Sequence, residues 1–362
     1  MPESFEINSS AGAYRVQVGD NLLSRILADH PESVILVDTS LVATLPTNVK
    51  KVISVSATEQ NKSIEQIAPI IVQLRALNTG RETHILAIGG GVIQDIATFV
   101  ASIYMRGISW RYLPTTFLGM VDSCIGGKSS INVAGYKNLV GNFYPPKDII
   151  IDLDFLKTLP LEHVIGGICE AAKICYAKSF EEFEDYLGDM PSAVLSIDQE
   201  KSIVIRSLLA KKWFIEVDEF DQNERLLLNF GHTFGHALES GTDFRFTHGI
   251  AVGIGMLVAG EYAKQQQLLT LQGINREALL ANHVMSLLKH LLNLKSDLQC
   301  IEIDRLLDKF DSDKKHQPNV YRVVVPVDNG ALMLRSIPRS SESQLHIQAA
   351  FESVIKSLIN LF

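Results

Sequence analysis

The pattern of apolar and polar residues changes near residue 159 and divides the chain into two regions. In the first region, short apolar runs alternate with segments of helical spacing. Residues 14–18 alternate as a strand with one buried face does, whereas 33–38 and 84–88 read as buried parallel strands. A helix is predicted over 63–77. This alternation predicts an α/β domain over residues 1–158, of the kind that binds nucleotides.

In the second region the apolar residues recur at helical spacing. Four long helical stretches are predicted, over 165–187, 191–215, 226–240 and 248–267. One strand is expected at 320–326 and a last helix from about residue 343. Residues 159–362 should therefore form a mostly helical second domain. No repeat or low-complexity linker separates the regions, so the two domains are expected to share a substantial interface.

Composition and charge exclude several classes of protein. Residues 85–105 are apolar enough to suggest a membrane span, but three glycines, Gln94 and Asp95 lie near the middle, so a buried strand and helix explain them better. A net charge of −8 argues against nucleic-acid binding. The first residues lack the features of a secretory signal, and the four cysteines show no paired spacing. No membrane association is predicted, and the cytoplasm is the expected compartment.

A glycine turn stands between a predicted strand and a predicted helix. Residues 89–91 are all glycine, which lets backbone N–H groups and the start of a helix approach a pyrophosphate. The segment is not the Gly-x-Gly-x-x-Gly fingerprint, and a glycine cluster alone is weak evidence for a nucleotide. Asp38, at the end of another predicted strand, stands where a ribose-binding carboxylate would lie. An ordinary turn or helix cap explains Asp38 equally well.

A glycine-rich segment with few helix signals contains several polar residues, namely Asp122, Lys128, Lys137 and Asn138. Lysines in loops usually contact only solvent. In an acidic protein, two lysines beside a Gly-Gly turn and an asparagine suit the capture of a phosphate or carboxylate better. Arg106 and Lys211 could add to this positive charge.

His232 and His236 lie four residues apart, and Asn229 lies three residues before the first of them. On a helix these three side chains would share one face. Such a pair is as often part of a solvated surface as part of a site. The neighbouring polar residues must therefore decide between the two.

Glu170 lies in an apolar helical stretch and is expected to be buried, although its spacing to Lys173 is also that of a surface ion pair. A buried carboxylate needs a metal ion or a partner. Together with His232 and His248, Glu170 would make a Glu/His₂ site, which suits a catalytic zinc with one open position. Spacing does not prove this site, because the three residues come from three predicted helices.

Further motifs extend these observations along most of the chain. They occupy residues 59–62, 89–95, 104–107, 114–116, 121–123, 126–128, 137–138, 152–158, 170–173, 218–219, 225–239, 248–249 and 313–315. In number and order these motifs resemble those of the 3-dehydroquinate synthases, a family of sugar phosphate cyclases. The resemblance is highly specific for the superfamily and less specific for the substrate.

The resemblance implies a Rossmann-like first domain, a helical metal- and substrate-binding second domain, and an active site in the cleft between them. It implies ligands for Zn²⁺ or Co²⁺ at Glu170, His232 and His248. The implied NAD site comprises Asp38, Glu59, Lys62, Gly90, Gly91, Val92, Asp95, Thr115, Thr116, Lys128, Lys137, Phe155, Lys157 and Thr158. The implied substrate contacts are Arg106, Asp122, Lys128, Asn138, Lys173, Lys211, Arg225, Asn229, His236 and Lys315, with Lys314 as the alternative to Lys315. Catalysis is expected from Lys173, Lys211, Asp221 and His236, the last of which would hold the phosphate and move protons.

The chemistry that the resemblance implies is a redox cycle without net redox change. NAD⁺ takes a hydride from a substrate alcohol, phosphate leaves by β-elimination, the hydride returns, and the opened ring closes to a carbocycle. The expected reaction converts 3-deoxy-D-arabino-heptulosonate 7-phosphate to 3-dehydroquinate, a lyase step of the shikimate pathway. A homodimer is also expected, with Arg106 reaching a neighbouring active site.

Three positions differ from the family pattern. Ser130 stands where glycine is usual, while Ile250 and Asp221 each stand where glutamate is usual. These differences suggest a divergent synthase, or a sister cyclase that acts on an amino analogue, sedoheptulose 7-phosphate or glucose 6-phosphate. Arg225, Asn229 and Lys211 would clamp a carboxylate, which favours the acid substrate. A polyol dehydrogenase is a further alternative, but the phosphate-binding lysines argue against it, and a role without catalysis is the least favoured.

Overall fold

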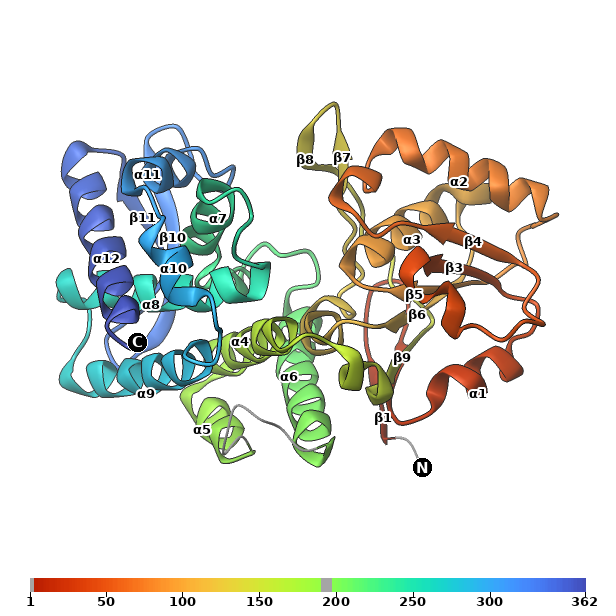
Figure 1. The fold of residues 1–362 in the computed structure, drawn as a ribbon, viewed down its shortest axis with the longest axis horizontal. Coiled ribbons are helices and arrows are strands. Elements are labelled where there is room, and N and C mark those ends of the chain that lie inside the picture. The colour runs from red at the N-terminus through yellow and green to blue at the C-terminus, as the bar shows by residue number, and fades with distance from the viewer. Residues whose placement is uncertain (1–2, 190–196) are drawn as a thin grey trace. The chain divides into compact units, whose positions relative to one another are not determined.

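The computed structural model describes residues 3–189 and 197–362, and the chain divides into two compact units. The N-terminal unit comprises Met1–Leu159 together with Ile215–Phe220. The C-terminal unit comprises Pro160–Phe214 and Asp221–Phe362. The chain therefore leaves the first unit, returns to it for six residues, and leaves it again (Figure 1).

A seven-stranded sheet forms the centre of the N-terminal unit, in the order β1-β2-β9-β6-β5-β3-β4. Its strands are β1 (Glu3–Ile7), β2 (Tyr14–Gly19), β3 (Val34–Asp38), β4 (Val52–Val55), β5 (Ile85–Gly89), β6 (Trp110–Pro114) and β9 (Asp148–Asp152). Only β1 is antiparallel to its neighbour, and the other pairs are parallel. The α/β class and the three predicted strands are confirmed, with ends that differ by one residue.

Helices and short turns connect these strands. They are α1 (Leu22–Asp29), the 3₁₀ turns η1 (Thr39–Thr44), η2 (Glu59–Asn61), η3 (Tyr104–Arg106) and η5 (Leu153–Thr158), α2 (Ile64–Ala76), α3 (Gly91–Ile103) and the π-helical η4 (Gly119–Ser123). The hairpin β7 (Ile131–Val133) and β8 (Tyr136–Val140) stands apart from the main sheet. Apolar side chains of α1 and of β3, β5, β6 and β9 form one core cluster. Burial of such apolar surface is the main free-energy gain of folding.

The C-terminal unit is mostly helical, as predicted. Its helices are α4 (Leu161–Lys178), α5 (Phe180–Asp189), α6 (Ile197–Val217, whose last three residues belong to the N-terminal unit), η6 (Glu224–Asn229, 3₁₀), α7 (His232–Gly241), α8 (His248–Gln265), α9 (Leu271–Leu288), α10 (Leu294–Gln299), α11 (Ile303–Asp311) and α12 (Ser341–Ile359). One hairpin, β10 (Val320–Val327) with β11 (Ala331–Pro338), accompanies them. Most residues of α8 are buried, as expected of a helix that other elements surround.

Two predicted helices and one predicted loop are wrong in detail. The stretch 226–240 is not one helix: η6 ends at Asn229, and α7 begins at His232 after Gly231, which has a φ of 75°. The stretch 165–187 is two helices, because Ser179 is extended between α4 and α5. The glycine-rich segment near Asp122 contains the π-helical η4. Of the predicted helix 191–215, residues 191–196 lie outside the described residues, and α6 runs from 197 to 217.

Within residues 3–189 and 197–362, no helix is long and apolar enough to cross a membrane. Residues 85–105 form β5, α3 and part of η3, as the glycines indicated. All four cysteines are free.

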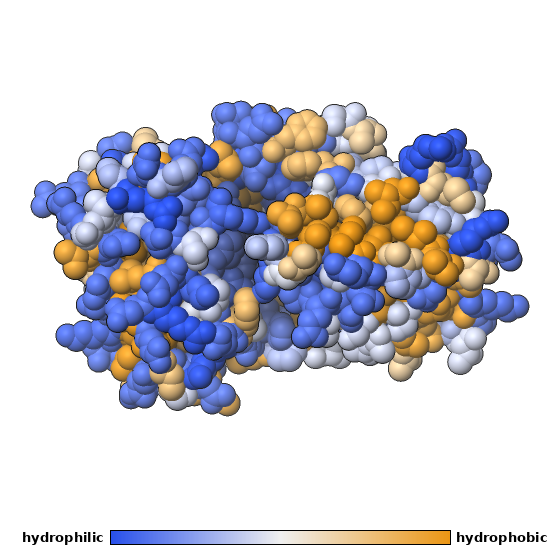
Figure 2. All heavy atoms as spheres, turned by 90° about the horizontal axis from the view of Figure 1, so that it is seen from above, coloured by the Kyte–Doolittle hydropathy of each residue, from blue (hydrophilic) through white to orange (hydrophobic). Residues whose placement is uncertain are grey.

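Figure 2 shows apolar side chains gathered over the N-terminal unit, where β8 exposes Leu139 and α2 exposes Val72.

Candidate active site

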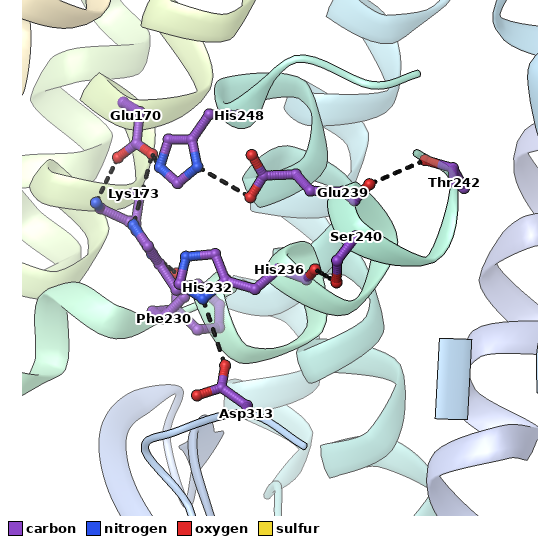
Figure 3. Close-up of polar contacts among 10 residues, drawn as sticks. All are labelled: Glu170, Lys173, Phe230, His232, His236, Glu239, Ser240, Thr242, His248 and Asp313. Atoms are coloured by element: carbon purple, nitrogen blue, oxygen red, sulfur yellow. Dashed lines mark hydrogen bonds and ion pairs between the residues drawn. The ribbon is translucent and has the colours of Figure 1, made fainter. Parts of the chain in front are cut away.

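Three helices of the C-terminal unit bring Glu170, His232 and His248 together (Figure 3). His232 and His248 are the first residues of α7 and α8, and Glu170 lies in the middle of α4. Glu170 Oε1 is 3.8 Å from His232 Nε2 and 3.4 Å from His248 Nε2. One ligand atom from each residue lies within 4.8 Å of the others. The predicted burial of Glu170 is confirmed, since its side chain is fully buried.

Glycines allow these helices to approach so closely. A Cβ atom on Gly249 would lie 2.3 Å from the carbonyl oxygen of Gly166, where α8 crosses α4. A Cβ atom on Gly255 would lie 2.1 Å from the carbonyl oxygen of Gly231, where α8 meets the start of α7. No side chain fits in either place. The backbone contacts therefore set the distance between the three predicted ligands.

The orientation of both histidines suits a metal ion. His232 Nδ1 is 3.3 Å from the carbonyl oxygen of Phe230, and His248 Nδ1 is 3.2 Å from Glu239 Oε2. With Nδ1–H donated to these acceptors, each Nε2 presents its lone pair toward Glu170. Burial, and then the charge of Lys173, hold the pKa of His232 well below its usual value, so its ring is neutral. Two imidazole nitrogens and one carboxylate fit Zn²⁺ or Co²⁺.

Lys173 compensates the charge of Glu170. Its ammonium donates to Glu170 Oε2, and both side chains are buried in α4. The i,i+3 spacing thus gives a buried ion pair and not a surface pair. One oxygen of Glu170 contacts Lys173, while the other faces the two histidines.

His236 is held by a carboxylate that the sequence did not single out. Its Nδ1 is 3.4 Å from Asp313 Oδ2, and Asp313 Oδ1 accepts the backbone N–H of Lys315 at 2.8 Å. Burial raises the pKa of Asp313, but these hydrogen bonds outweigh it and lower the pKa to about 2. Burial also lowers the pKa of His236. Asp313 is therefore ionised and the imidazole ring of His236 is neutral. The contact with Asp313 involves Nδ1 of His236 and not Nε2.

Lys315 differs sharply from its neighbour Lys314. The Nζ atom of Lys315 is buried and has no hydrogen-bond partner among the described residues, whereas Lys314 is exposed. Burial lowers the pKa of Lys315 to about 8. A buried ammonium without a hydrogen-bond partner is costly and suits an anionic ligand. Of the two lysines that the sequence left open, Lys315 therefore fits an anion.

Of the other predicted residues of this unit, the substrate contacts Lys211 and Arg225 are buried, whereas the substrate contact Asn229 and the catalytic residue Asp221 are partly exposed. Asn229 ends η6 and donates to the carbonyl oxygen of Leu226 at 3.0 Å. It does not continue the helix of His232 and His236, so the predicted shared helical face is wrong. Asp221 has a φ of 62°, in the left-handed region.

In the N-terminal unit, the predicted glycine turn lies where β5 ends. Gly90 is the N-cap of α3, Gly91 and Val92 begin that helix, and Thr115 and Thr116 follow the adjacent strand β6. A Cβ atom on Gly90 would lie 2.9 Å from Thr116 Cγ2. Ligands of parallel α/β sheets bind beyond the carboxyl ends of the strands. The geometry is thus compatible with a phosphate at this turn.

Asp38 ends β3 and accepts the backbone N–H of Ser40 at 3.1 Å, so it caps η1. The cap interpretation is confirmed, and a ribose contact stays a prediction. The remaining predicted nucleotide residues after β9, namely Phe155, Lys157 and Thr158, lie in η5, where Lys157 pairs with Asp154.

Four predicted residues form one polar network. Lys62 Nζ is 2.9 Å from Asn138 Oδ1, 3.2 Å from Asp95 and 3.5 Å from Glu59. Burial raises the pKa of Asp95 to about 6. Asp95 also accepts the backbone N–H of Ser130 at 3.0 Å, an interaction that does not require the Ser130 side chain. Predicted cofactor residues and a predicted substrate residue are therefore joined by direct contacts.

The other predicted residues of the N-terminal unit lie in turns and in the hairpin. Arg106 and Asn138 have φ values of 67° and 52°, which are unusual for residues other than glycine and often mark functional positions. Asp122 lies in η4, Lys137 is exposed in β8, and Lys128 Nζ is 5.9 Å from the ring centre of Phe143.

Two protein families match consecutive parts of the chain. Residues 52–166 match the 3-dehydroquinate synthase N-terminal family, and residues 167–316 match the 3-dehydroquinate synthase C-terminal family. The 3-dehydroquinate synthase of Saccharolobus solfataricus is 34% identical over 284 residues, which cover 77% of this chain and 78% of that protein. The 3-dehydroquinate synthase of Dictyoglomus turgidum is 38% identical over 271 residues, which cover 71% and 75%.

A solved structure shows the same fold. The 2-deoxy-scyllo-inosose synthase complexed with carbaglucose-6-phosphate, NAD⁺ and Co²⁺ superimposes with a TM-score of 0.82, covers 97% of this chain and 99% of its own, and is 22% identical. That identity supports the fold alone. The family matches and the relatives above 30% identity support more: this chain belongs to the 3-dehydroquinate synthase family and is a phosphate-eliminating carbon–oxygen lyase.

Proposed function

We propose that this enzyme converts 3-deoxy-D-arabino-heptulosonate 7-phosphate to 3-dehydroquinate and phosphate, with NAD and a divalent metal ion as cofactors. One observation carries the proposal: the Glu170/His232/His248 donor set lies beside cationic groups, Lys173 and the buried ammonium of Lys315. Such a pair of features suits a phosphorylated alcohol. The curated relatives named above carry the same activity in their names.

Glu170, His232 and His248 would hold the metal, and the glycine turn after β5 would bind the pyrophosphate of NAD. When bound, the metal polarises a substrate alcohol as a Lewis acid, and NAD supplies the temporary oxidation. The structure of 2-deoxy-scyllo-inosose synthase, which has the same fold, is a complex with NAD⁺ and Co²⁺, and this supports the same pair of cofactors here.

The side chains of this chain would bind and orient the substrate. The ammonium of Lys315 would neutralise an anionic group, and Lys173 would add positive charge close to it. His236, neutral and held at Nδ1 by Asp313, would exchange a proton at Nε2 with the substrate. Arg225 and Lys211, both buried cations, would bind the substrate carboxylate.

The direct test offers the purified enzyme four sugar phosphates in parallel, with NAD⁺ and Zn²⁺ or Co²⁺. These are the keto-acid phosphate, its amino analogue, sedoheptulose 7-phosphate and glucose 6-phosphate. We expect phosphate release and a carbocyclic product from the keto-acid phosphate, without NADH accumulation. Preference for another of the four would assign a sister cyclase, and stoichiometric NADH would assign a polyol dehydrogenase. A chelator should abolish the activity, and Zn²⁺ or Co²⁺ should restore it.

A further inference from the structure

Glu239 is neither a predicted metal ligand nor a predicted substrate contact, yet it contacts a predicted metal ligand. It lies in the last turn of α7, and its Oε2 atom is 3.2 Å from His248 Nδ1 (Figure 3). The Glu239 side chain is only 15% exposed. Its backbone oxygen accepts the N–H of Phe244 at 2.7 Å, which ties the end of α7 to the loop before His248. The contact is thus part of an ordered junction between α7 and α8.

This contact decides which nitrogen of His248 is available. In the neutral ring that metal binding requires, a proton on Nδ1 donated to Glu239 leaves the lone pair on Nε2. That Nε2 atom is the one that lies 3.4 Å from Glu170 Oε1. His232 is fixed in the same sense by the backbone oxygen of Phe230. A backbone acceptor cannot be removed by substitution, whereas Glu239 can.

A second group of possible metal ligands makes it important which nitrogen of His248 is available. His236, Glu239 and His248 also offer ligand atoms within 4.8 Å of one another. If Nδ1 carried no proton, its lone pair could bind a metal ion beside Glu239 and His236. The Glu239–His248 hydrogen bond therefore favours the first group of ligands over the second.

We propose that Glu239 is a positioning residue that holds His248 in the Nδ1–H form, and that its negative charge sets the affinity of the Glu170/His232/His248 site for metal. The proposal rests on the proposed function, which places a metal there. A carboxylate partner makes an imidazole a better electron donor than an amide does, and loss of such a partner typically lowers metal affinity about 10–100-fold.

The test measures metal binding directly. Metal-free wild type, Glu239→Gln and Glu239→Asp are titrated with Zn²⁺ against a chromophoric chelator, and the visible spectrum of each Co²⁺-loaded protein is recorded. Glu239→Gln keeps the size of the side chain and should raise the Zn²⁺ Kd about 10–100-fold. Glu239→Asp keeps the charge with a shorter reach and should lie in between. The Co²⁺ spectrum should change in Glu239→Gln.

Glu352→Gln is the matched control, because Glu352 is exposed on α12 and accepts a hydrogen bond from Gln348 of the same helix. It should bind Zn²⁺ as wild type does. Thermal unfolding without metal shows whether each variant is folded.

Wild-type Zn²⁺ affinity and an unchanged Co²⁺ spectrum in Glu239→Gln would overturn this inference and leave the proposed function intact. Two Zn²⁺ ions bound tightly by wild type would also overturn it, since Glu239 would then be a ligand itself. A wild type that binds no Zn²⁺ would instead contradict the metal site of the proposed function.

Discussion

At the scale of single residues, the charges around the predicted ligands differ in how they are compensated. The ammonium of Lys173 pairs with Glu170 inside α4, whereas that of Lys315 is buried without a hydrogen-bond partner among the described residues. Burial of an ammonium group that has no hydrogen-bond partner destabilises the fold. An anion that binds Lys315 would offset this cost. The buried ammonium therefore favours ligand binding at the expense of the stability of the ligand-free protein.

The prediction for Lys315 has both a kinetic and a thermal part. Lys315→Gln should lower kcat/KM for the phosphorylated substrate by about tenfold to a hundredfold, as expected for a lost charged hydrogen bond. The same substitution should raise Tm of the ligand-free protein, because a buried charge is removed. Steady-state kinetics and thermal unfolding measure the two effects. Lys314→Gln is the control, and a larger kinetic loss in Lys314→Gln than in Lys315→Gln would reverse the assignment.

At the scale of elements, the candidate site depends on how closely helices can cross. Gly166 and Gly249 bring the backbones of α4 and α8 into contact where the helices cross, and Glu170 follows Gly166 by one turn. His248 precedes Gly249 directly. A change in the spacing of this crossing therefore moves a predicted carboxylate ligand relative to a predicted histidine ligand.

Gly249→Ala should consequently destabilise the enzyme and weaken metal binding together. The added methyl group would lie 2.3 Å from the Gly166 oxygen, and overpacking of this kind typically costs about 1–3 kcal/mol. Denaturant unfolding and Zn²⁺ titration check both effects. Gly188→Ala in α5 is the control, since nothing lies within 4 Å of its added Cβ atom, and alanine should be neutral or stabilising there. Equal stability of Gly249→Ala and wild type would show that the helices can separate without cost.

The elements also show how far the sequence could be interpreted. Buried parallel strands are apolar runs, so β3 and β5 were predicted to within one residue. Helical spacing did not reveal the break at Gly231, because the apolar residues on both sides of it continue the same period. The three ligands lie on three helices, so resemblance and not spacing indicated them. Glu239 and Asp313 gained their roles only from contacts with histidines, although both lie within motifs that the sequence analysis marked.

At the scale of the whole molecule, stability depends on pH through groups that folding removes from water. His283 on α9 contacts the hydroxyl of the buried Tyr186, with 3.0 Å between Nε2 and the oxygen. Burial lowers the pKa of His283 to about 4, from a usual value of 6.5. Between these two pH values the unfolded chain binds a proton that the folded protein does not bind. The free energy of unfolding must therefore fall as the pH decreases from 6.5 to 4 and level off below that for this group.

His283→Gln should reduce this pH dependence, because glutamine can still contact Tyr186 but does not titrate. We expect the loss of unfolding free energy between pH 6.5 and 4 to be smaller by roughly 2 kcal/mol than in wild type. Denaturant unfolding across this pH range provides the measurement, with the exposed His290→Gln as the control. An identical pH profile for His283→Gln and wild type would show that the ring takes up its proton without unfolding.

The return of residues 215–220 to the N-terminal unit limits how the gene can be divided. A coding sequence cut after residue 159 would leave this short segment on the wrong fragment. The first fragment would then lack Glu216, which accepts from Asn8, and Glu219, which accepts from Ser10. It would also lack Phe220, whose ring lies 5.3 Å from that of Phe143. Recombination between homologues should for the same reason exchange the segment along with the first 159 residues, so that each parent contributes a complete set of partners.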